Sequence, residues 1–490
     1  MRDKYRILNI EFRMSKLRQI HLLLIVLLLT VAPAGGLATE YEPAWESLDS
    51  RPIPQWYDEA KFGIFIHWGL YSVPAWAPKG TYAEWYWNSL NVQGSPTAQF
   101  HEKTYGKDFR YQDFAGMFKA ELFDPDEWGE ILKRSGAKYV VLTSKHHDGF
   151  ALFPSKYSWN WNAADAGPHR DLAGDLSKAV KKAGLKMGFY YSLYEWYHPF
   201  FEEEGASIYK YLTTESKKKK SGDPRKLVAK YVDEHMLPQM TELVKAYEPS
   251  LLWTDGEWSY EAEVWKSREF LAWLFNSSPV KDEIVVNDRW GKGIRFNHGG
   301  FYTPEYGGPA AYREQFRKGH KWEECRGIGA SFGYNRNESL DDYMTGEGLV
   351  HMLADIVSHG GNLLLNIGPT GDGRIPVIMQ QRLAEIGEWL NVNGEAIYGS
   401  RPWRVPAEGE KIRYTSKGGA VYAVALEWPG KKLELESPKP GKGTKVELLG
   451  RPGDLKWRKE GGKFVIEVPP LSPAEAPCRH AFVFRLTGVE

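Results

Sequence analysis

The chain has 490 residues, and its 63 Lys and Arg balance 63 Asp and Glu, so the formal net charge is +0. Apart from the run Lys217–Lys220 the charges are scattered, which leaves no long-range field to attract nucleic acid, and we expect no nucleic-acid partner. The length is sufficient for two or three domains with large buried cores.

The N-terminal segment has the layout of a secretory signal. Lys16 and Arg18 precede a short apolar run that ends in small residues, "HLLLIVLLLTVAPAGGLA". Because this run is too short for a comfortable membrane span, residues 1–38 are predicted to be a signal peptide cleaved after Ala38, with Met14 as an alternative start. We therefore expect a protein of the secretory pathway, lysosomal or secreted, with no membrane attachment after signal removal.

Two further features bear on this route. Asn276 and Asn337 each begin a glycosylation sequon of the form Asn-X-Ser, although Pro279 directly after the first sequon should weaken it. The two cysteines, Cys325 and Cys478, are too few to hold a fold together, and their spacing does not show whether they pair.

Short apolar runs that end in polar or glycine residues recur between residues 39 and 398, and each is typical of a buried strand. They lie at 62–69, 138–149, 185–196, 251–256, 283–291 and 361–369. Helix-length amphipathic patterns alternate with several of them, at 171–184, 226–247 and 346–360. The alternation predicts an α/β fold with parallel strands, most naturally a (β/α)8-like barrel over residues 39–398, with a doubly wound open sheet as the alternative.

The pattern changes near the C-terminus. From about Lys411, six short segments alternate apolar and polar residues between Gly and Pro turns, and no helix-length pattern separates them. This alternating pattern predicts a separate antiparallel β-sandwich domain over residues 399–490. We find no group of candidate catalytic residues in it.

In a β/α barrel the functional groups lie where the strands end at the C-terminal face. Trp253 and Asp255 are two residues apart and share one strand face, so Asp255 is predicted to point into the barrel mouth beside an indole ring. A ring of carboxylates, imidazoles and aromatic groups suits a glycosidase, which needs two carboxyl groups beside the bond it breaks. The predicted strand ends supply His67, His146, His147, Asp148, Tyr190, Tyr191, Glu195, Trp253, Asp255, Asn287, Asp288 and Arg289.

Other interpretations of these residues stay open at this point. A metal-dependent hydrolase would use His67 with the "HHD" run, but no H-x-H or H-E-x-x-H pattern fixes the ligands. A third class is a secreted sugar-binding protein whose barrel has lost its catalytic carboxylates. A lone strand-end Asp255 also fits a helix cap or half of an ion pair. His146 and His147 can serve one site only if their strand ends before them, because neighbouring strand residues face opposite ways.

Several motifs together resemble the α-L-fucosidases of glycoside hydrolase family twenty-nine, in particular the animal, lysosomal type. The resemblance runs from about Trp45 to the C-terminus. It implies a (β/α)8-like barrel followed by a β-sandwich, and removal of terminal α-L-fucose from glycoproteins, glycolipids or oligosaccharides. It further implies retention through a fucosyl-enzyme intermediate and is compatible with a homo-tetramer. We expect no cofactor, and no metal because the sequence contains no strong metal-ligand motif. The motifs are "FGIFIHWGLYSVPAW", "AEWYWN", "FDPDEW", "KHHDGFALF", "GPHRDLAGDL", "FYYSLYEW", "LLWTDGEW", "VVNDRWG", "KWEECRGIGASFGYN" and "GGNLLLNIGPTGDG".

The resemblance also implies roles for single residues. Asp255 matches the nucleophile of the family, whereas the acid/base varies in position and leaves two candidates, Glu305 in "FYTPEY" and Asp288 in "VVNDRW". We favour Glu305, because an arginine next to Asp288 would lower its pKa, while a partly desolvated Glu on a loop can keep its proton. The residues that match fucose-holding positions are His67, Glu84, Trp85, His146, His147, Tyr190, Trp253 and Arg289.

Overall fold

The computed structural model describes residues 40–196, 198, 224–307 and 319–490, so the predicted signal peptide, residues 1–38, lies outside the described residues. Residues 43–490 form one compact unit. Within the described ranges, we find no helix that combines the length and the apolar character needed to cross a membrane.

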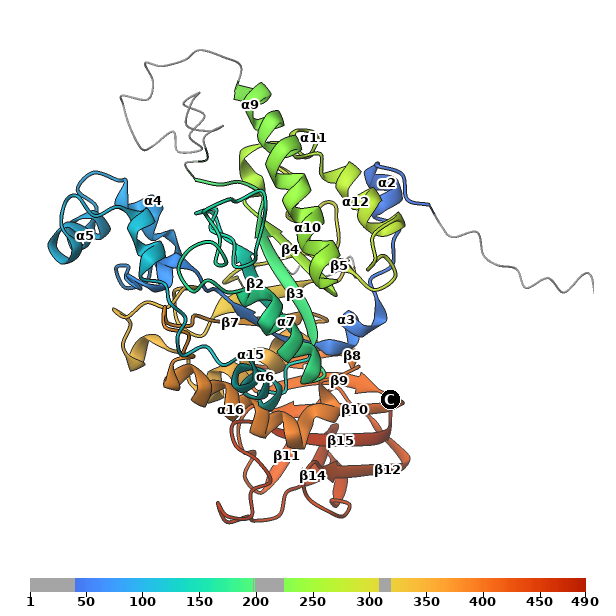
Figure 1. Ribbon diagram of the computed structural model, residues 1–490. Coiled ribbons are helices and arrows are strands. Elements are labelled where there is room, and N and C mark those ends of the chain that lie inside the picture. Colours follow the sequence, from blue (N-terminus) through green and yellow to red (C-terminus); the bar gives the residue numbers. More distant parts are fainter. Residues whose placement is uncertain (1–39, 197, 199–223, 308–318) are drawn as a thin grey trace, which may run out of the picture. The chain divides into compact units, whose positions relative to one another are not determined.

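A sheet of seven parallel strands forms the centre of the N-terminal part (Figure 1). The strands lie in the order β5-β4-β3-β2-β1-β7-β6, so neighbours in the sheet are also neighbours in the chain, except that β1 pairs with β7. Nearly every strand residue is buried, as expected for parallel strands covered on both faces. The strands are β1 (Phe62–Ile66), β2 (Tyr139–Lys145), β3 (Lys186–Ser192), β4 (Leu251–Asp255), β5 (Val285–Val286), β6 (Glu323–Gly327) and β7 (Asn362–Ile367).

A short extended segment, residues 301–305, lies between β5 and β6. Parallel bridges join it to Asn287 just after β5, and to Trp322 and Cys325 at β6. The close approach requires glycine at Gly300, where a Cβ atom would lie 1.7 Å from the carbonyl oxygen of Val286. The segment stands where an eighth strand would stand, so the (β/α)8-like barrel is confirmed and the doubly wound alternative is wrong.

Helices separate most of the strands. The longer helices are α5 (Pro96–Tyr105), α6 (Pro125–Arg134), α7 (Leu172–Lys182), α9 (Pro224–Tyr231), α10 (Leu237–Tyr247), α12 (Ser267–Asn276), α15 (Gly346–Ser358) and α16 (Val377–Asn393). The shorter ones are α2 (Trp45–Leu48), α3 (Gln55–Ala60), η1 (Leu70–Ser72), η2 (Ala83–Trp85), α4 (Tyr86–Leu90), η3 (Tyr111–Gly116), η5 (Val232–Met236), η6 (Glu257–Ser259), α11 (Ala262–Trp265), η7 (Leu340–Asp342) and η8 (Gly394–Ala396).

Local sequence explains where these helices begin and break. The Asp124 side chain caps α6 by accepting hydrogen bonds from the backbone N–H groups of Asp126 and Glu127. The single helix expected over 226–247 is instead interrupted by the π-helical turn η5. The break falls just before Pro238, whose ring lacks an N–H group and crowds the preceding turn.

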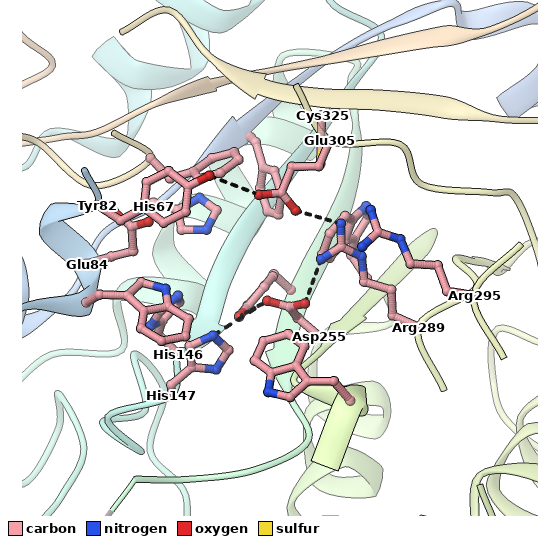
Figure 2. A pocket seen from close by; sticks show the side chains of 16 residues that line it. His67, Tyr82, Glu84, His146, His147, Asp255, Arg289, Arg295, Glu305 and Cys325 are labelled. Carbon is pink, nitrogen blue, oxygen red and sulfur yellow. Dashed lines mark hydrogen bonds and ion pairs between the residues drawn. The ribbon is translucent and has the colours of Figure 1, made fainter. Parts of the chain in front are cut away.

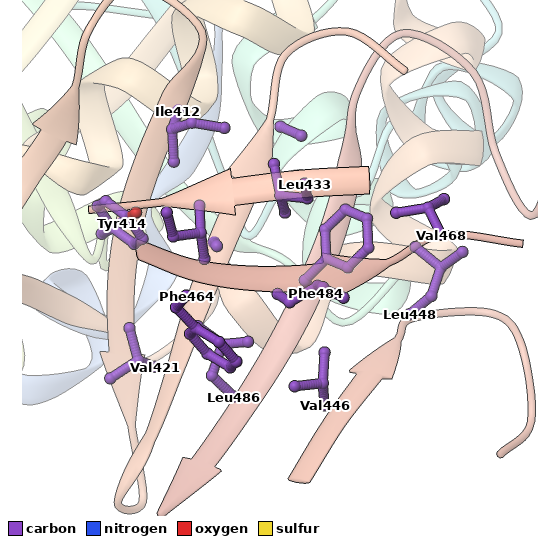
Figure 3. Packing of buried hydrophobic residues seen from close by; sticks show 14 residues of the cluster. Ile412, Tyr414, Val421, Leu433, Val446, Leu448, Phe464, Val468, Phe484 and Leu486 are labelled. Carbon is purple, nitrogen blue, oxygen red and sulfur yellow. The ribbon is translucent and has the colours of Figure 1, made fainter. Parts of the chain in front are cut away.

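The C-terminal part is a sandwich of two antiparallel sheets, as predicted. A five-stranded sheet in the order β12-β15-β10-β9-β8 packs on a three-stranded sheet in the order β11-β14-β13. Figure 3 shows side chains from both sheets meeting in one apolar core, with Phe464 and Leu433 from the smaller sheet and Phe484 from the larger. The strands are β8 (Arg401–Glu408), β9 (Ile412–Lys417), β10 (Ala420–Ala425), β11 (Lys432–Leu435), β12 (Pro440–Leu448), β13 (Trp457–Glu460), β14 (Lys463–Glu467) and β15 (Phe482–Val489).

Hydrogen bonds and an ion pair connect the sandwich to the barrel. The indole of Trp389 on α16 donates to the carbonyl oxygen of Ala481 at 2.9 Å, and Arg413 on β9 pairs with Asp355 on α15. The exact boundary between the two domains stays a prediction. Cys325 and Cys478 do not pair with each other, because both are free thiols.

Candidate active site

A cavity of about 150 Å³ opens at the carboxyl ends of the barrel strands (Figure 2). Ligand pockets for drug-sized molecules are commonly about 300–1,000 Å³, so this one suits a single sugar ring. The cavity is lined by every residue that the sequence predicted as nucleophile, acid/base or fucose-binding residue, except Asp288. The lining residues are Phe65, His67, Tyr82, Glu84, Trp85, His146, His147, Tyr190, Trp253, Asp255, Trp258, Arg289, Arg295, Glu305, Cys325 and Phe332.

The ends of β2 and β4 explain how neighbouring residues reach the same cavity. Strand β2 ends at Lys145, so the backbone no longer alternates at His146 and His147, and both imidazoles face the cavity. Trp253 and Asp255 lie two apart within β4 and reach the cavity from one strand face, as predicted.

Asp255 is buried, and two side chains donate hydrogen bonds to it. Its Oδ2 accepts a hydrogen bond from the hydroxyl of Tyr190 at 3.0 Å, and its Oδ1 accepts one from Nη1 of Arg289 at 2.7 Å. Nε2 of His147 lies 3.6 Å from Oδ2. Burial alone would raise the pKa of Asp255, but the charge of Arg289 and the hydrogen bonds from Arg289 and Tyr190 outweigh it and leave this pKa below its ordinary value. The carboxylate is therefore an anion at neutral pH.

Arg289 also binds the second carboxyl group of the cavity. Its Nη2 donates to Oε2 of Glu305 at 2.9 Å, and the hydroxyl of Tyr82 donates to the other oxygen of Glu305 at 3.4 Å. The guanidinium carbon lies 4.5 Å from the ring centre of Trp253, which supports it from one side. One guanidinium group thus bridges Asp255 and Glu305 and holds them side by side, as Figure 2 shows.

Asp288 has a different environment from the one expected. Its carboxylate accepts hydrogen bonds from the hydroxyl of Thr303 at 2.6 Å and from the backbone N–H of Phe296 at 2.9 Å, and it is fully buried. The neighbouring Arg289 points at Asp255 and Glu305, so the premise that this arginine pairs with Asp288 was wrong. Burial raises the pKa of Asp288 above its ordinary value. These contacts tie the end of β5 to the segment 301–305.

Hydrogen bonds at Nδ1 fix the tautomers of two imidazoles, those of His67 and His147. The amide nitrogen of Asn366 donates to a backbone carbonyl at 2.6 Å, which turns its oxygen toward Nδ1 of His67 at 2.7 Å. The hydroxyl of Ser192 likewise donates to a backbone carbonyl at 2.7 Å and accepts from Nδ1 of His147 at 2.7 Å. Each ring therefore carries its hydrogen on Nδ1 and presents Nε2 as an acceptor. Burial lowers the pKa of His67 to about 3 and that of His147 to about 4, so both rings stay neutral in mildly acidic solution.

Glu84 supplies a further carboxyl group on the opposite wall. It accepts hydrogen bonds from the backbone N–H of Gly333 at 2.8 Å and from the hydroxyl of Ser331 at 3.3 Å. Burial raises its pKa to about 7, so near neutral pH it is present both with and without its proton. In either form it can hydrogen-bond a hydroxyl group in the cavity.

Glu323 on β6 is a buried carboxyl group that the sequence reading missed. Its oxygens accept hydrogen bonds from the indole of Trp253 at 3.1 Å, from the hydroxyl of Tyr57 at 2.8 Å and from the hydroxyl of Tyr139. Burial raises its pKa to about 7. The only signal was a charged pair inside the motif "KWEECRG", whose polarity also concealed strand β6. Glu323 fixes the indole that supports Arg289.

Other cavity residues also escaped the sequence reading. Trp258 stands inside the quoted motif "LLWTDGEW", and Tyr82 directly precedes "AEWYWN", so proximity to these motifs was an available signal. The same signal existed for Phe65 in "FGIFIHWGLYSVPAW" and for Cys325 and Phe332 in "KWEECRGIGASFGYN". Arg295 lies outside every quoted motif, and only the fold brings it to the cavity.

In the described part of the chain, metal-ligand spacing occurs in one group, Glu195, His198 and His235, whose ligand atoms lie within 4.8 Å of one another. None of the three lines the cavity, and Nζ of Lys145 already binds Oε1 of Glu195 at 2.9 Å. The histidines that a metal hydrolase was expected to use belong to the cavity and not to this group.

The two predicted glycosylation sites are both half-buried. Asn276 is the last residue of α12, and the side-chain nitrogen of Asn337 donates to the carbonyl oxygen of Ala77 at 3.1 Å. Their modification stays a prediction.

A β/α barrel whose strand ends hold two carboxyl groups in a cavity the size of one sugar is the arrangement of a glycoside hydrolase. The α-L-fucosidase family profile matches residues 30–395, and that of the α-L-fucosidase C-terminal domain matches residues 407–487. Tissue α-L-fucosidases of Rattus norvegicus and Homo sapiens are each 45% identical to this chain, over 95% and 96% of it and 97% of each relative.

Solved structures agree with these sequence matches. The crystal structure of Thermotoga maritima α-fucosidase is 40% identical with a TM-score of 0.75, covering 91% of this chain and 99% of that one. Its complex with fucose is 38% identical with a TM-score of 0.74, covering 91% of this chain and 100% of that one. The chain belongs to the α-L-fucosidase family, and as an enzyme it is a glycoside hydrolase that acts on α-L-fucosides.

Proposed function

We propose that the protein releases terminal α-L-fucose from glycans with retention, through a fucosyl-enzyme intermediate on Asp255. The observation that carries the proposal is the bridge from Arg289 to Asp255 and Glu305 within one cavity. Retaining glycosidases need a nucleophile and an acid/base on the two sides of the anomeric carbon, about 5–5.5 Å apart. A nucleophile must be ionised, and the lowered pKa of Asp255 provides this.

Glu305 is the acid/base in this proposal. Its side chain is 25% exposed, against 12% for Asp255, so it can exchange protons with solvent and with the departing group. Asp288 is fully buried, and its hydrogen bonds go to Thr303 and Phe296. In the free enzyme Nη2 of Arg289 donates to Glu305, so we infer that substrate draws Glu305 away from the guanidinium before it protonates the leaving oxygen.

The remaining cavity groups hold the sugar. The free Nε2 atoms of His67 and His147 accept hydrogen bonds from sugar hydroxyls, and Glu84 binds a further hydroxyl. His146, Trp85, Tyr190 and Trp253 surround the ring, and aromatic groups receive the apolar methyl that distinguishes fucose from galactose. Because a pocket discriminates only modestly through one methyl group, the hydroxyl pattern carries most of the specificity.

Replacement of the nucleophile tests the proposal. Asp255→Gly should fold but cut the turnover of an aryl α-L-fucoside by about 10⁴-fold or more, and azide should restore part of the rate as a fucosyl azide of inverted configuration. Proton NMR of the first wild-type product should show the α anomer. Near-normal turnover of the variant, or a β anomer from the wild type, would contradict the assignment.

A chelator separates this proposal from the metal-hydrolase alternative. Wild-type turnover should be unchanged after EDTA treatment and dialysis. Loss of turnover that zinc restores would favour the alternative and direct attention to Glu195, His198 and His235, the group with ligand spacing.

The cellular setting is part of the proposal. The relatives include proteins named tissue and plasma α-L-fucosidases, which favours a lysosomal or secreted protein that acts on fucosylated glycoproteins, glycolipids or oligosaccharides. The neutral imidazoles of His67 and His147 support function in an acidic compartment, because their pKa values lie near 3 and 4. A homo-tetramer is the assembly to test by light scattering.

A further inference from the structure

We propose that Trp258 forms a second sugar subsite at the rim of the cavity, where the pyranose ring that carries the fucose stacks on its indole. The inference rests on the proposed fucosidase function. It identifies the chemical class of the leaving group, which is a neutral pyranose with an apolar C–H face. The residues assigned to fucose binding do not include Trp258, although it lines the same cavity.

The backbone turn after the nucleophile places this tryptophan at the rim. Asp255 ends β4, and the chain then reverses at Gly256, whose φ of 77° lies in the left-handed region. A Cβ atom at this position would lie 2.4 Å from the ring of Tyr194, so the tight turn requires glycine. The one-turn helix η6 (Glu257–Ser259) follows at once and carries Trp258 three residues beyond the nucleophile.

Two other rings fix the orientation of the indole. His147 and Tyr194 stack with their ring centres 4.7 Å apart and their planes 3° from parallel. Trp258 packs nearly perpendicular to both rings, with centre distances of 5.7 Å to His147 and 5.4 Å to Tyr194. An edge-to-face arrangement of this kind restrains the indole before any ligand binds.

The indole nevertheless remains 40% exposed, which makes it one of the few large apolar side chains of the described residues that face solvent. Exposure of a large apolar group costs free energy unless a ligand covers it, and aromatic rings of this kind pair with the apolar faces of sugars. Since the cavity has room for one ring, the next sugar of the substrate must lie at the rim, beside this side chain.

Two substrates with different leaving groups test the subsite. α-L-Fucosyl fluoride has no second ring, whereas a fucosyl-galactose disaccharide places galactose at the rim; the disaccharide linkage is the one that the wild type cleaves fastest. For Trp258→Ala, the ratio of kcat/KM for the disaccharide to kcat/KM for the fluoride should fall about tenfold, and Trp258→Phe should recover most of it. Trp159→Ala is the matched control, because Trp159 is 78% exposed and lies outside the cavity lining, and it should leave the ratio unchanged.

A second measurement separates stacking from an indirect effect on the acid. With fucosyl fluoride as donor and free lactose as acceptor, the fucosyl-enzyme partitions between water and sugar, and Trp258→Ala should lower the share of transfer. Equal losses on both substrates, or an unchanged share of transfer, would overturn the subsite and assign Trp258 to support of His147. If the wild type hydrolyses neither substrate, the proposed function itself fails.

Discussion

Arg289 contacts both Asp255 and Glu305, and this single side chain keeps Asp255 ionised and holds the two carboxyl groups side by side. Its charge lowers the pKa of Asp255 against the effect of burial, and its second terminal nitrogen holds Glu305. Trp253 supports the guanidinium, and Glu323 in turn fixes the indole of Trp253. At the scale of residues, the site is therefore a chain of contacts that extends from the cavity into the barrel interior.

The acid/base assignment gives a prediction about leaving groups. Glu305→Ala should lower kcat/KM for a disaccharide by about 10²–10⁴-fold, but should lower it far less for an activated aryl fucoside, whose departure needs little protonation. Asp288→Ala should affect the two substrates alike, because Asp288 acts through Thr303 and Phe296. Kinetics of both variants on both substrates are the measurement; selective loss in Asp288→Ala, with azide rescue to a product of retained configuration, would transfer the role to Asp288.

Glu323 gives a prediction about pH. Burial raises the pKa of Glu323 from 4.5 to about 7. The contribution of this group to the free energy of unfolding is therefore fully present below pH 4.5 and is lost as the pH rises to about 7. Glu323→Gln has no such titration. The free energy of unfolding of this variant minus that of the wild type should therefore increase by about 3 kcal/mol between pH 4.5 and 7 and then level off.

Urea unfolding at pH 4.5, 5.5, 6.5 and 7.5 measures this difference. Glu408→Gln serves as a control, because Glu408 lies in the sandwich on β8 and outside the barrel interior. A difference that does not change with pH would mean that burial does not raise the pKa of Glu323 in the folded protein.

At the scale of elements, the segment 301–305 is the part on which closure of the barrel depends. It carries Glu305 between β5 and β6 and takes the place of a regular strand. The connection from β5 to this segment contains turns and no helix, so the alternation of strands and helices did not predict it. Its two ends are set by Gly300, next to β5, and by the bridge from Glu305 to Cys325.

Gly300→Ala should disturb this closure. The added methyl group would lie 1.7 Å from the carbonyl oxygen of Val286, so the backbone must shift, at a cost of about 2–4 kcal/mol in stability. The shift should also displace Glu305 and lower kcat. Gly116→Ala is the matched control, since a Cβ atom there meets nothing within 4 Å. Thermal unfolding and turnover of both variants are the measurements, and equal behaviour of the two would contradict the role given to the segment.

At the scale of the whole molecule, the sandwich is joined to the barrel far from the cavity. Arg413 on β9 pairs with Asp355 on α15, with side-chain exposures of 15% and 26%, and Trp389 donates to the backbone of Ala481. No residue of the sandwich lines the described cavity. We therefore expect the sandwich to contribute to stability and not to chemistry.

Arg413→Ala tests this expectation. Loss of the partly buried pair should lower the free energy of unfolding by about 1–3 kcal/mol and leave KM unchanged. Arg458→Ala removes an exposed pair with Glu460 within the sandwich, where solvent screens the charges, and should change stability by less than about 0.5 kcal/mol. Denaturant unfolding and steady-state kinetics check both; a raised KM in Arg413→Ala would mean that the sandwich communicates with the site.

The sequence by itself determined the features that depend on local pattern and on chain order. Apolar runs predicted β1 to β5 and β7, the alternation with helices predicted a parallel barrel, and the strand-end rule brought together Asp255, His67, His146 and His147. The C-terminal sandwich followed from its period of two, although β8 and β13, neither of which contains a buried residue, were missed.

Only the tertiary structure decided what depends on contacts between distant residues. Sequence placed Arg289 next to Asp288, but its side chain reaches Asp255 and Glu305, 34 and 16 residues away along the chain. Strand β6 is buried although it carries Glu323, because hydroxyl and indole donors from other elements satisfy that carboxyl group. Such partners are set by the closure of the barrel, which no local periodicity encodes, and so the pKa values, the tautomers and the contact between Arg289 and Glu305 had to come from the fold.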